Sequence, residues 1–224
     1  MNNGKKIYVC DEVSILRELY DDIISWPYEY NSTFALINAI AISHYRQYAQ
    51  GYPASITELR SWHPESISKD YKYIMSLELS QEDIQYAQAR QYGYKDWEDL
   101  IIKDSPINLN FERAVDALIE GNESLLRQLL SEHPDLSQQS SNFGHRAKLI
   151  HYIAANGVET YRQITPFNLE AITQLLLDHG CDPYADHNIY GGNGNVIDLI
   201  MTSAHPNEAG VAKDVVALIQ GFSS

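Results

Sequence analysis

The sequence has few cysteines and lacks the apolar segments that mark membrane and secreted proteins. Only two cysteines, Cys10 and Cys181, occur in 224 residues, which argues against a disulfide framework and fits a reducing cytoplasm. No apolar run approaches the roughly 20 residues that a membrane-spanning helix needs. No apolar core follows the N-terminal Met-Asn-Asn-Gly-Lys-Lys segment, so no secretory signal is expected. We therefore expect a cytoplasmic protein with no membrane partner.

Basic residues are also scarce. The chain has 16 Lys and Arg residues against 30 Asp and Glu residues, a formal net charge of -14. Such a surface repels phosphates, so nucleic acid is not an expected partner. It would suit a basic protein partner, although solubility alone is also a sufficient reason for acidity. The ordinary share of apolar residues, 44%, indicates a globular chain. A length of 224 residues allows one large domain or two small ones.

Sequence motifs of catalysis and metal binding are lacking as well. The chain has no Gly-x-Ser-x-Gly and no HExxH motif. The run Gly191-Gly-Asn-Gly194 lacks the Lys and Ser/Thr of a phosphate-binding loop, which favours a tight turn. Five possible zinc ligands lie within nine positions, but they fall in a turn, where such residues are common. They are His179, Cys181, Asp182, Asp186 and His187. No metal and no cofactor are expected.

The second half of the chain contains pairs of short amphipathic helices. In the first pair, Asn110 is the expected cap of a helix from Phe111. Gly121-Asn122 should end this helix, and Asn122 should cap the next one. Apolar residues then follow at helical spacing, namely Leu125, Leu126, Leu129 and Leu130. Pro134 should end this second helix, because proline cannot continue the hydrogen-bond ladder.

A second and a third pair follow. Ile150–Ala155 is expected to form a short inner helix, residues 159–167 look inserted, and Asn168 should cap the outer helix, which ends at Gly180. In the third pair a turn at 190–195 should precede an inner helix at 196–204. Residues 205–210 should link it to an outer helix at 211–219.

The two runs Ile150-His-Tyr-Ile-Ala-Ala-Asn-Gly157 and Leu169–Pro183 together resemble one ankyrin repeat. The resemblance extends to degenerate repeats on either side and covers about residues 108–222. The usual Thr-Pro-Leu-His opening is replaced by Lys148-Leu-Ile-His151, which keeps only the histidine. The resemblance implies a short helical solenoid, a fold that usually presents a surface for recognition.

The first half of the chain is predicted to be helical without repeats. Helices are expected at 11–26 and 32–50, and Asp96 should start another. Ser55-Ile-Thr-Glu58 and Ser80-Gln-Glu-Asp83 read as capping boxes. A boundary at Ser105-Pro106 would divide the chain into a helical region at 1–105 and a repeat domain at 106–224. The predicted fold is all-α, with an irregular helical N-terminal region packed on a three-unit ankyrin-like solenoid.

The run Gln85–Leu100 contains an Ala-Arg pair, a Tyr-Gly-Tyr step and a tryptophan. It resembles a segment found just upstream of ankyrin repeats in some bacterial proteins. The resemblance implies a bacterial protein with a helical lead-in to the repeats, and it implies no enzymatic activity.

Seven polar residues lie in the turns or inner helices of the second and third units, and the ankyrin resemblance places these elements on a concave contact face. They are His145, Arg146, His151, Tyr152, Asn156, Tyr190 and His205. Arg and Tyr are favoured anchors at protein interfaces. For His151, a structural role in its own repeat is the stronger interpretation.

Three functions remain open from the sequence. The first is recognition of a protein partner through residues 140–210. The second is an enzyme or small-molecule binder that uses His145, Arg146, His151, Tyr190 and His205 as a pocket. The third is self-assembly through the last repeat, 211–219. An open groove would favour recognition, whereas a closed polar cavity would favour the second function.

Overall fold

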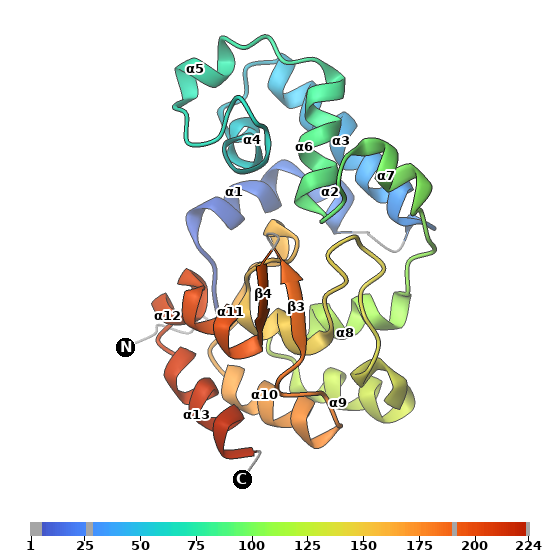
Figure 1. Cartoon of the computed structure of the whole chain (residues 1–224), viewed down its shortest axis with the longest axis vertical. Coiled ribbons are helices and arrows are strands. Elements are labelled where there is room, and N and C mark those ends of the chain that lie inside the picture. Colours follow the sequence, from blue (N-terminus) through green and yellow to red (C-terminus); the bar gives the residue numbers. More distant parts are fainter. Residues whose placement is uncertain (1–5, 26–28, 190–191, 223–224) are drawn as a thin grey trace. The chain divides into compact units, whose positions relative to one another are not determined.

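The computed structural model describes residues 6–25, 29–189 and 192–222. The chain is mostly helical, with 62% helix and 6% strand, which confirms the predicted all-α class at this level. No helix in the described part of the chain combines the length and apolar character needed to cross a membrane. The chain divides into two compact units (Figure 1). Unit 1 comprises Met1–Val13, Asn108–Ser141 and His145–Ser224, and unit 2 comprises Ser14–Ile107 and Asn142–Gly144.

Unit 1 contains two rows of helical elements (Figure 1). One row consists of α8 (Leu109–Ile119), the 3₁₀ helix η4 (Leu149–Ala154) and α11 (Val196–Thr202). The other consists of α9 (Glu123–Glu132), α10 (Leu169–Asp178) and α13 (Ala212–Phe222). Neighbours contact one another both along each row and between the rows. Their buried aliphatic side chains form one continuous core, because each helix presents an apolar face at helical spacing.

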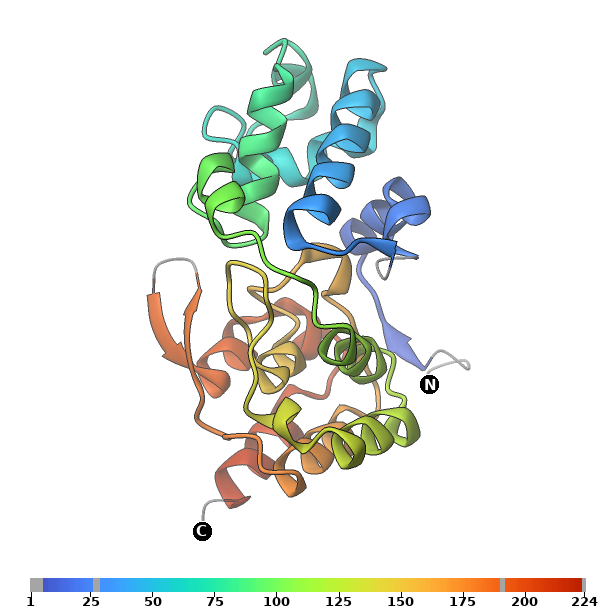
Figure 2. The same ribbon diagram turned by 90° about the vertical axis from the view of Figure 1, so that its right-hand side faces the viewer.

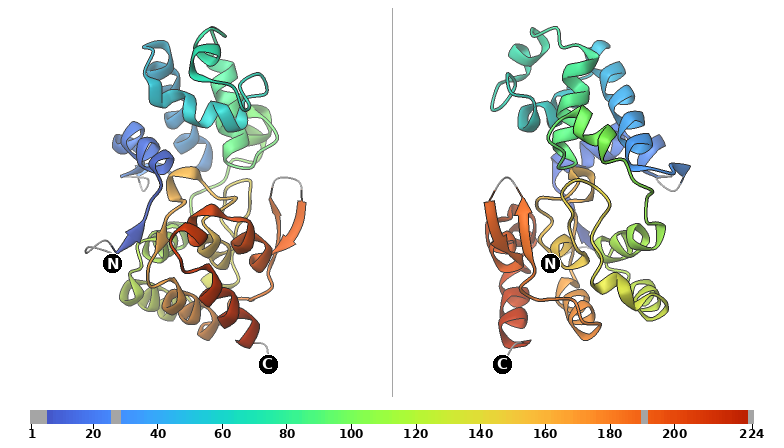
Figure 3. Two further views of the ribbon diagram at one scale, coloured as in Figure 1. Left: turned by 90° about the vertical axis from the view of Figure 1, so that its left-hand side faces the viewer. Right: turned by 45° about the vertical axis from the view of Figure 1, so that its right-hand side comes forward.

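The remaining elements of unit 1 are short. They are the 3₁₀ helices η3 (Pro134–Ser137) and η5 (Thr160–Arg162), the helix α12 (Ala204–Glu208) and four strands. Strand β1 (Ile7–Tyr8) pairs antiparallel with β2 (Thr165–Pro166), so the inserted residues 159–167 are joined to the N-terminal segment. Strands β3 (Asp186–Ile189) and β4 (Gly192–Asn195) form a hairpin that extends along one side of unit 1 (Figures 2 and 3).

Unit 2 is an irregular helical bundle. Helix α1 (Asp11–Leu19) begins in unit 1 and belongs to unit 2 from Ser14 onward. Its other helices are α2 (Asp21–Ile24), α3 (Thr33–Ala49), η2 (Pro53–Ser55), α4 (Ile56–Trp62), α5 (Tyr71–Met75), α6 (Gln81–Gln91) and α7 (Trp97–Ile102). Helices α3 and α6 lie side by side (Figure 2), and α4 packs against α6. The core around them includes Tyr48, Leu59, Ile74 and Ile84.

The local structure differs from the sequence prediction in unit 1. Ile150–Ala155 was expected to be α-helical, but the segment is a 3₁₀ helix that Ala155 ends in the left-handed conformation, with φ of 46°. Residues 192–195 form a strand where a turn was expected. Most of the expected linker 205–210 is helical in α12. Asn108, and not Asn110, caps α8. The strand forms because the Asn-Gly run has a pairing partner in Asp186–Ile189, which local signals could not reveal.

Unit 2 also contains one wrong cap prediction. Ser80 and Asp83 form the expected capping box at the start of α6. Ser55 makes no side-chain cap at α4, and the Glu58 carboxylate is buried and accepts a hydrogen bond from the Tyr20 hydroxyl at 2.6 Å. Because the Glu58 carboxylate makes this tertiary hydrogen bond, it does not cap α4.

Candidate recognition surface and the polar cluster beneath it

Two turns of unit 1 near the predicted site are joined by a side-chain hydrogen bond. The Gln138 side chain donates a hydrogen bond to the Gly180 carbonyl at 2.6 Å. Ser140 and Lys148 form an isolated antiparallel bridge, which closes the first turn. We define the turn edge as residues 138–141, 145–148 and 180–187. Its exposed side chains are Gln138, Arg146, Asp182, Tyr184 and Asp186.

Arg146 is exposed and has an unusual backbone conformation. Its φ is 54°, in the left-handed region that favours glycine. Its guanidinium has no hydrogen bond or ion pair to any residue that the structure describes. A bulky residue held in this conformation costs about 1 kcal/mol or more. The contacts that hold the turn come from the residues around Arg146 and not from its side chain, which makes that side chain a candidate for a role outside the fold itself.

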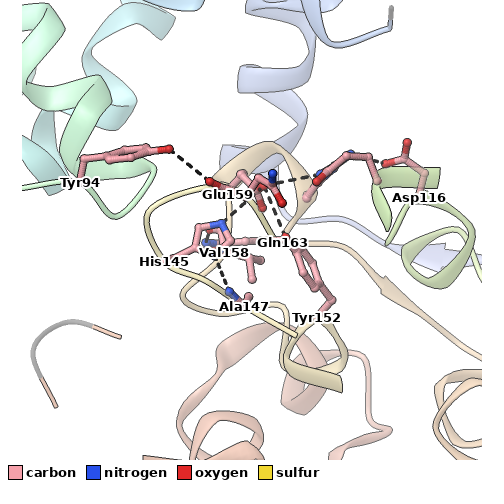
Figure 4. Close-up of polar contacts among 11 residues, drawn as sticks. Tyr94, Asp116, His145, Ala147, Tyr152, Val158, Glu159 and Gln163 are labelled. Atoms are coloured by element: carbon pink, nitrogen blue, oxygen red, sulfur yellow. Dashed lines mark hydrogen bonds and ion pairs between the residues drawn. The ribbon is translucent and has the colours of Figure 1, made fainter. Parts of the chain in front are cut away.

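The two histidines around Arg146 face inward. His145 accepts the Ala147 backbone N–H at Nδ1, at 3.0 Å, and its Nε2 lies 3.5 Å from Glu159 Oε1 (Figure 4). His151 is buried, accepts the Lys148 N–H at Nδ1 and faces the Ala185 carbonyl through Nε2 at 3.2 Å. Burial lowers the pKa of His151 to about 4. The rings of His145 and His151 therefore stabilise the turns and do not form part of an exposed contact surface.

The other predicted site residues do not converge with Arg146. Tyr152 is buried, and its hydroxyl lies 3.5 Å from Glu159 Oε1. His205 is half-buried on α12 and faces Gln163 Oε1 at 3.2 Å, while Asn156 is half-buried after η4. Tyr190 lies outside the described residues. A partner at the surface can therefore reach Arg146, but it cannot reach the side chains of His151 and Tyr152.

Beneath the turn edge lies an ionic cluster that sequence reasoning missed. The Arg162 side chain is 2% exposed, and its guanidinium contacts three carboxylates. It donates a short hydrogen bond to Glu112, bonds to Asp116 at 2.9 Å and lies 3.5 Å from Glu159. Glu112 and Asp116 lie one turn apart on α8, so both point toward the inserted segment. Arginine is usually exposed, and no local pattern marks this one as buried.

Burial governs the electrostatics of this cluster. Burial raises the pKa of Glu112 to about 7, although the Arg162 guanidinium opposes the shift. Burial also raises the pKa of Glu159, but His145 and Arg162 outweigh it, so the net shift is downward. Within the described residues, Glu159 Oε2 and Arg162 Nε are buried without a hydrogen-bond partner. The cluster is therefore tightly desolvated and not evenly paired.

The described residues offer no group of three or more His, Cys, Asp or Glu side chains placed to hold a metal ion. Cys181, one of the residues weighed for zinc, is buried, and burial raises its pKa to about 12. An open depression of about 430 Å³ lies elsewhere on unit 1. Its lining residues are Lys6, Glu120, Gly121, Phe167 and Asn168, and none of the seven predicted site residues is among them.

Comparison of the chain with protein-family models, with curated proteins and with solved structures found no match.

Proposed function

We propose that unit 1 is a short ankyrin-like stack that recognises a protein partner through its turn edge. The proposal is supported by the two rows of helical elements, α8–η4–α11 and α9–α10–α13, which pair in the order expected for three stacked units. It narrows the contact surface predicted from the sequence, because His151 and Tyr152 are buried.

The observation that carries the proposal is the conformation of Arg146. A strained and exposed arginine without a described partner is explained if its side chain serves an intermolecular contact. Tyr184 is 43% exposed on the adjoining turn and adds an aromatic anchor of the type that dominates binding energy at interfaces. Asp182 and Asp186 place two exposed carboxylates on the 180–187 turn, and these can pair with basic residues of a partner.

The cytoplasm of a bacterium is the compartment that we propose. The free state of Cys10 and Cys181 supports a reducing environment. The bacterial origin is supported only by the resemblance of Gln85–Leu100 to segments that precede ankyrin repeats.

The experiment is affinity capture from the native cell with mass spectrometry, followed by calorimetric titration of the captured protein. Arg146→Ala and Tyr184→Ala should each weaken binding at least about tenfold, the loss expected of an interface anchor. Arg127→Ala is the matched control, because Arg127 is exposed on α9 in the other row. Equal affinity in all three variants, with melting temperatures unchanged, would refute the proposed surface.

A further inference from the structure

The ionic cluster of unit 1 contains more acidic than basic groups. In the part of the chain that the structure describes, Glu112, Asp116 and Glu159 each contact the guanidinium of Arg162. Glu112 and Glu159 are 3% and 0% exposed, so water cannot solvate a surplus charge on either of them. Burying an uncompensated carboxylate is costly, and such a group usually takes up a proton.

His145 is the only other titratable base described in this cluster, and its hydrogen bond assigns its protonation state. Its Nδ1 accepts the Ala147 backbone N–H at 3.0 Å, and a nitrogen that accepts a hydrogen bond carries no proton. The ring proton therefore lies on Nε2, which faces Glu159 Oε1 at 3.5 Å (Figure 4). If the ring instead carried the positive charge that lowers the pKa of Glu159, the three carboxylates would still outnumber the two cations.

The three carboxylates differ in the solvent exposure and the contacts that stabilise their negative charge. Asp116 is 31% exposed, so solvent stabilises its charge. Glu159 Oε1 lies 3.5 Å from each of three groups, the Arg162 guanidinium, His145 Nε2 and the Tyr152 hydroxyl. Glu112 is buried and has Arg162 as its hydrogen-bond donor, while the negative charges of Asp116 and Glu159 lie nearby.

We propose that Glu112 holds a proton in weakly acidic solution and that this proton stabilises the packing of the inserted segment 159–167 against α8. The pKa of Glu112, which burial raises to about 7, agrees with this assignment. The other titratable groups that face the site are the Tyr152 and Tyr161 hydroxyls, and burial raises the pKa of both above 10, so neither releases a proton here. As pH rises, loss of the proton leaves a second buried carboxylate against one arginine and weakens the attachment.

The sign of the effect follows from proton linkage. Between about pH 5 and pH 7 the folded state holds the Glu112 proton, whereas the unfolded state, with the ordinary pKa of 4.5, has lost it. Stability therefore decreases as pH rises through this window. One proton changes the unfolding equilibrium constant by up to about tenfold per pH unit.

The test compares unfolding of three full-length proteins by urea at pH 5, 6, 7 and 8. Glu112→Gln keeps an acceptor for Arg162 and mimics the protonated acid, so its stability should exceed that of wild type increasingly from pH 5 to 8. Asp116→Asn removes one of the negative charges that raise the pKa of Glu112, so the loss of stability should begin at lower pH than in wild type. An unchanged slope in Glu112→Gln would overturn the proposal.

A second measurement does not depend on a variant that folds. Carboxyl-carbon NMR of wild-type protein labelled at glutamate should show one resonance with a midpoint near pH 7. Backbone hydrogen exchange in residues 159–167 should accelerate through the same midpoint. If all glutamate resonances titrate below about pH 5.5, no buried proton exists and the proposal is wrong, whatever the outcome of the recognition experiment.

Discussion

His151 Nδ1 accepts the backbone N–H of Lys148 at 3.0 Å, and the opposite ring nitrogen lies 3.2 Å from the carbonyl oxygen of Ala185. One neutral imidazole thus connects the start of η4 to the turn at residues 180–187. The contact gives His151 a structural role within unit 1. It also makes the charge state of the ring a condition of the fold, because a proton on Nδ1 would remove the acceptor.

We expect His151 to resist protonation down to about pH 4, since burial lowers its pKa to about 4. As pH falls from about 6.5 to 4, the unfolded chain takes up a proton at this position and the folded chain does not, so stability decreases with acidification. Imidazole nitrogen NMR should show His151 with its proton on Nε2 throughout this range. Titration of His151 near pH 6.5 would contradict the buried arrangement.

Arg146→Gly should stabilise unit 1 by about 0.5–1 kcal/mol, because glycine adopts the observed φ of 54° without strain. Arg146→Ala keeps a β-carbon in the same conformation and should leave stability nearly unchanged. Urea unfolding of both variants measures the difference. A glycine variant that is less stable than the alanine variant would show that the left-handed conformation carries no cost.

Arg162→Met should destabilise unit 1 by about 3–5 kcal/mol, the loss expected when one partner of a buried ionic group is removed. Adding Glu112→Gln and Glu159→Gln to that variant should restore part of the loss, because the buried charges are then absent as well. Chemical denaturation of the single and triple variants provides the comparison. A triple variant no more stable than Arg162→Met would show that packing of the Arg162 stem, and not charge, is what matters.

Gly144→Ala should destabilise unit 2 by more than about 2 kcal/mol, as overpacking against a rigid backbone does. A β-carbon at this position would lie 2.6 Å from the Gly93 carbonyl carbon and 2.8 Å from the Tyr94 nitrogen. Gly51→Ala is the control, because its β-carbon would meet nothing within 4 Å, although its φ of +72° still imposes about 1 kcal/mol of strain. Thermal unfolding that ranks Gly51→Ala as the more damaging change would count against the close approach.

Sequence patterns predicted the helices better than the short elements. Ser32, Asp96 and Asn122 each stand before a helix and cap it, since a small polar side chain can accept a free backbone N–H. Asn168 occupies the expected N-cap position of α10, yet its side chain donates to the Gly121 carbonyl instead. Long-range partners of this kind leave no local periodicity and so could not be anticipated.

The candidate site was predicted only in part. Arg146 was singled out and lies exposed on the turn edge, whereas Arg162 and Glu159 were assigned only to an insertion without a known role. Their burial depends on α8, whose carboxylates lie 46 and 50 residues earlier in the chain than Arg162, and on the pairing of β2 with β1. Neither contact has a signature in a single sequence. Whether Arg146 binds a partner stays a prediction.

The pairing of Ile7–Tyr8 with Thr165–Pro166, together with Val13 in the core of unit 1, has a consequence for biosynthesis. During translation, more than 150 residues after β1 must be synthesised before its partner β2 leaves the ribosome. Most of unit 2, residues 14–107, is synthesised within that interval and can begin to fold first. A nascent chain stalled near residue 130 should therefore protect residues 33–91 from protease while residues 7–13 remain open to cleavage.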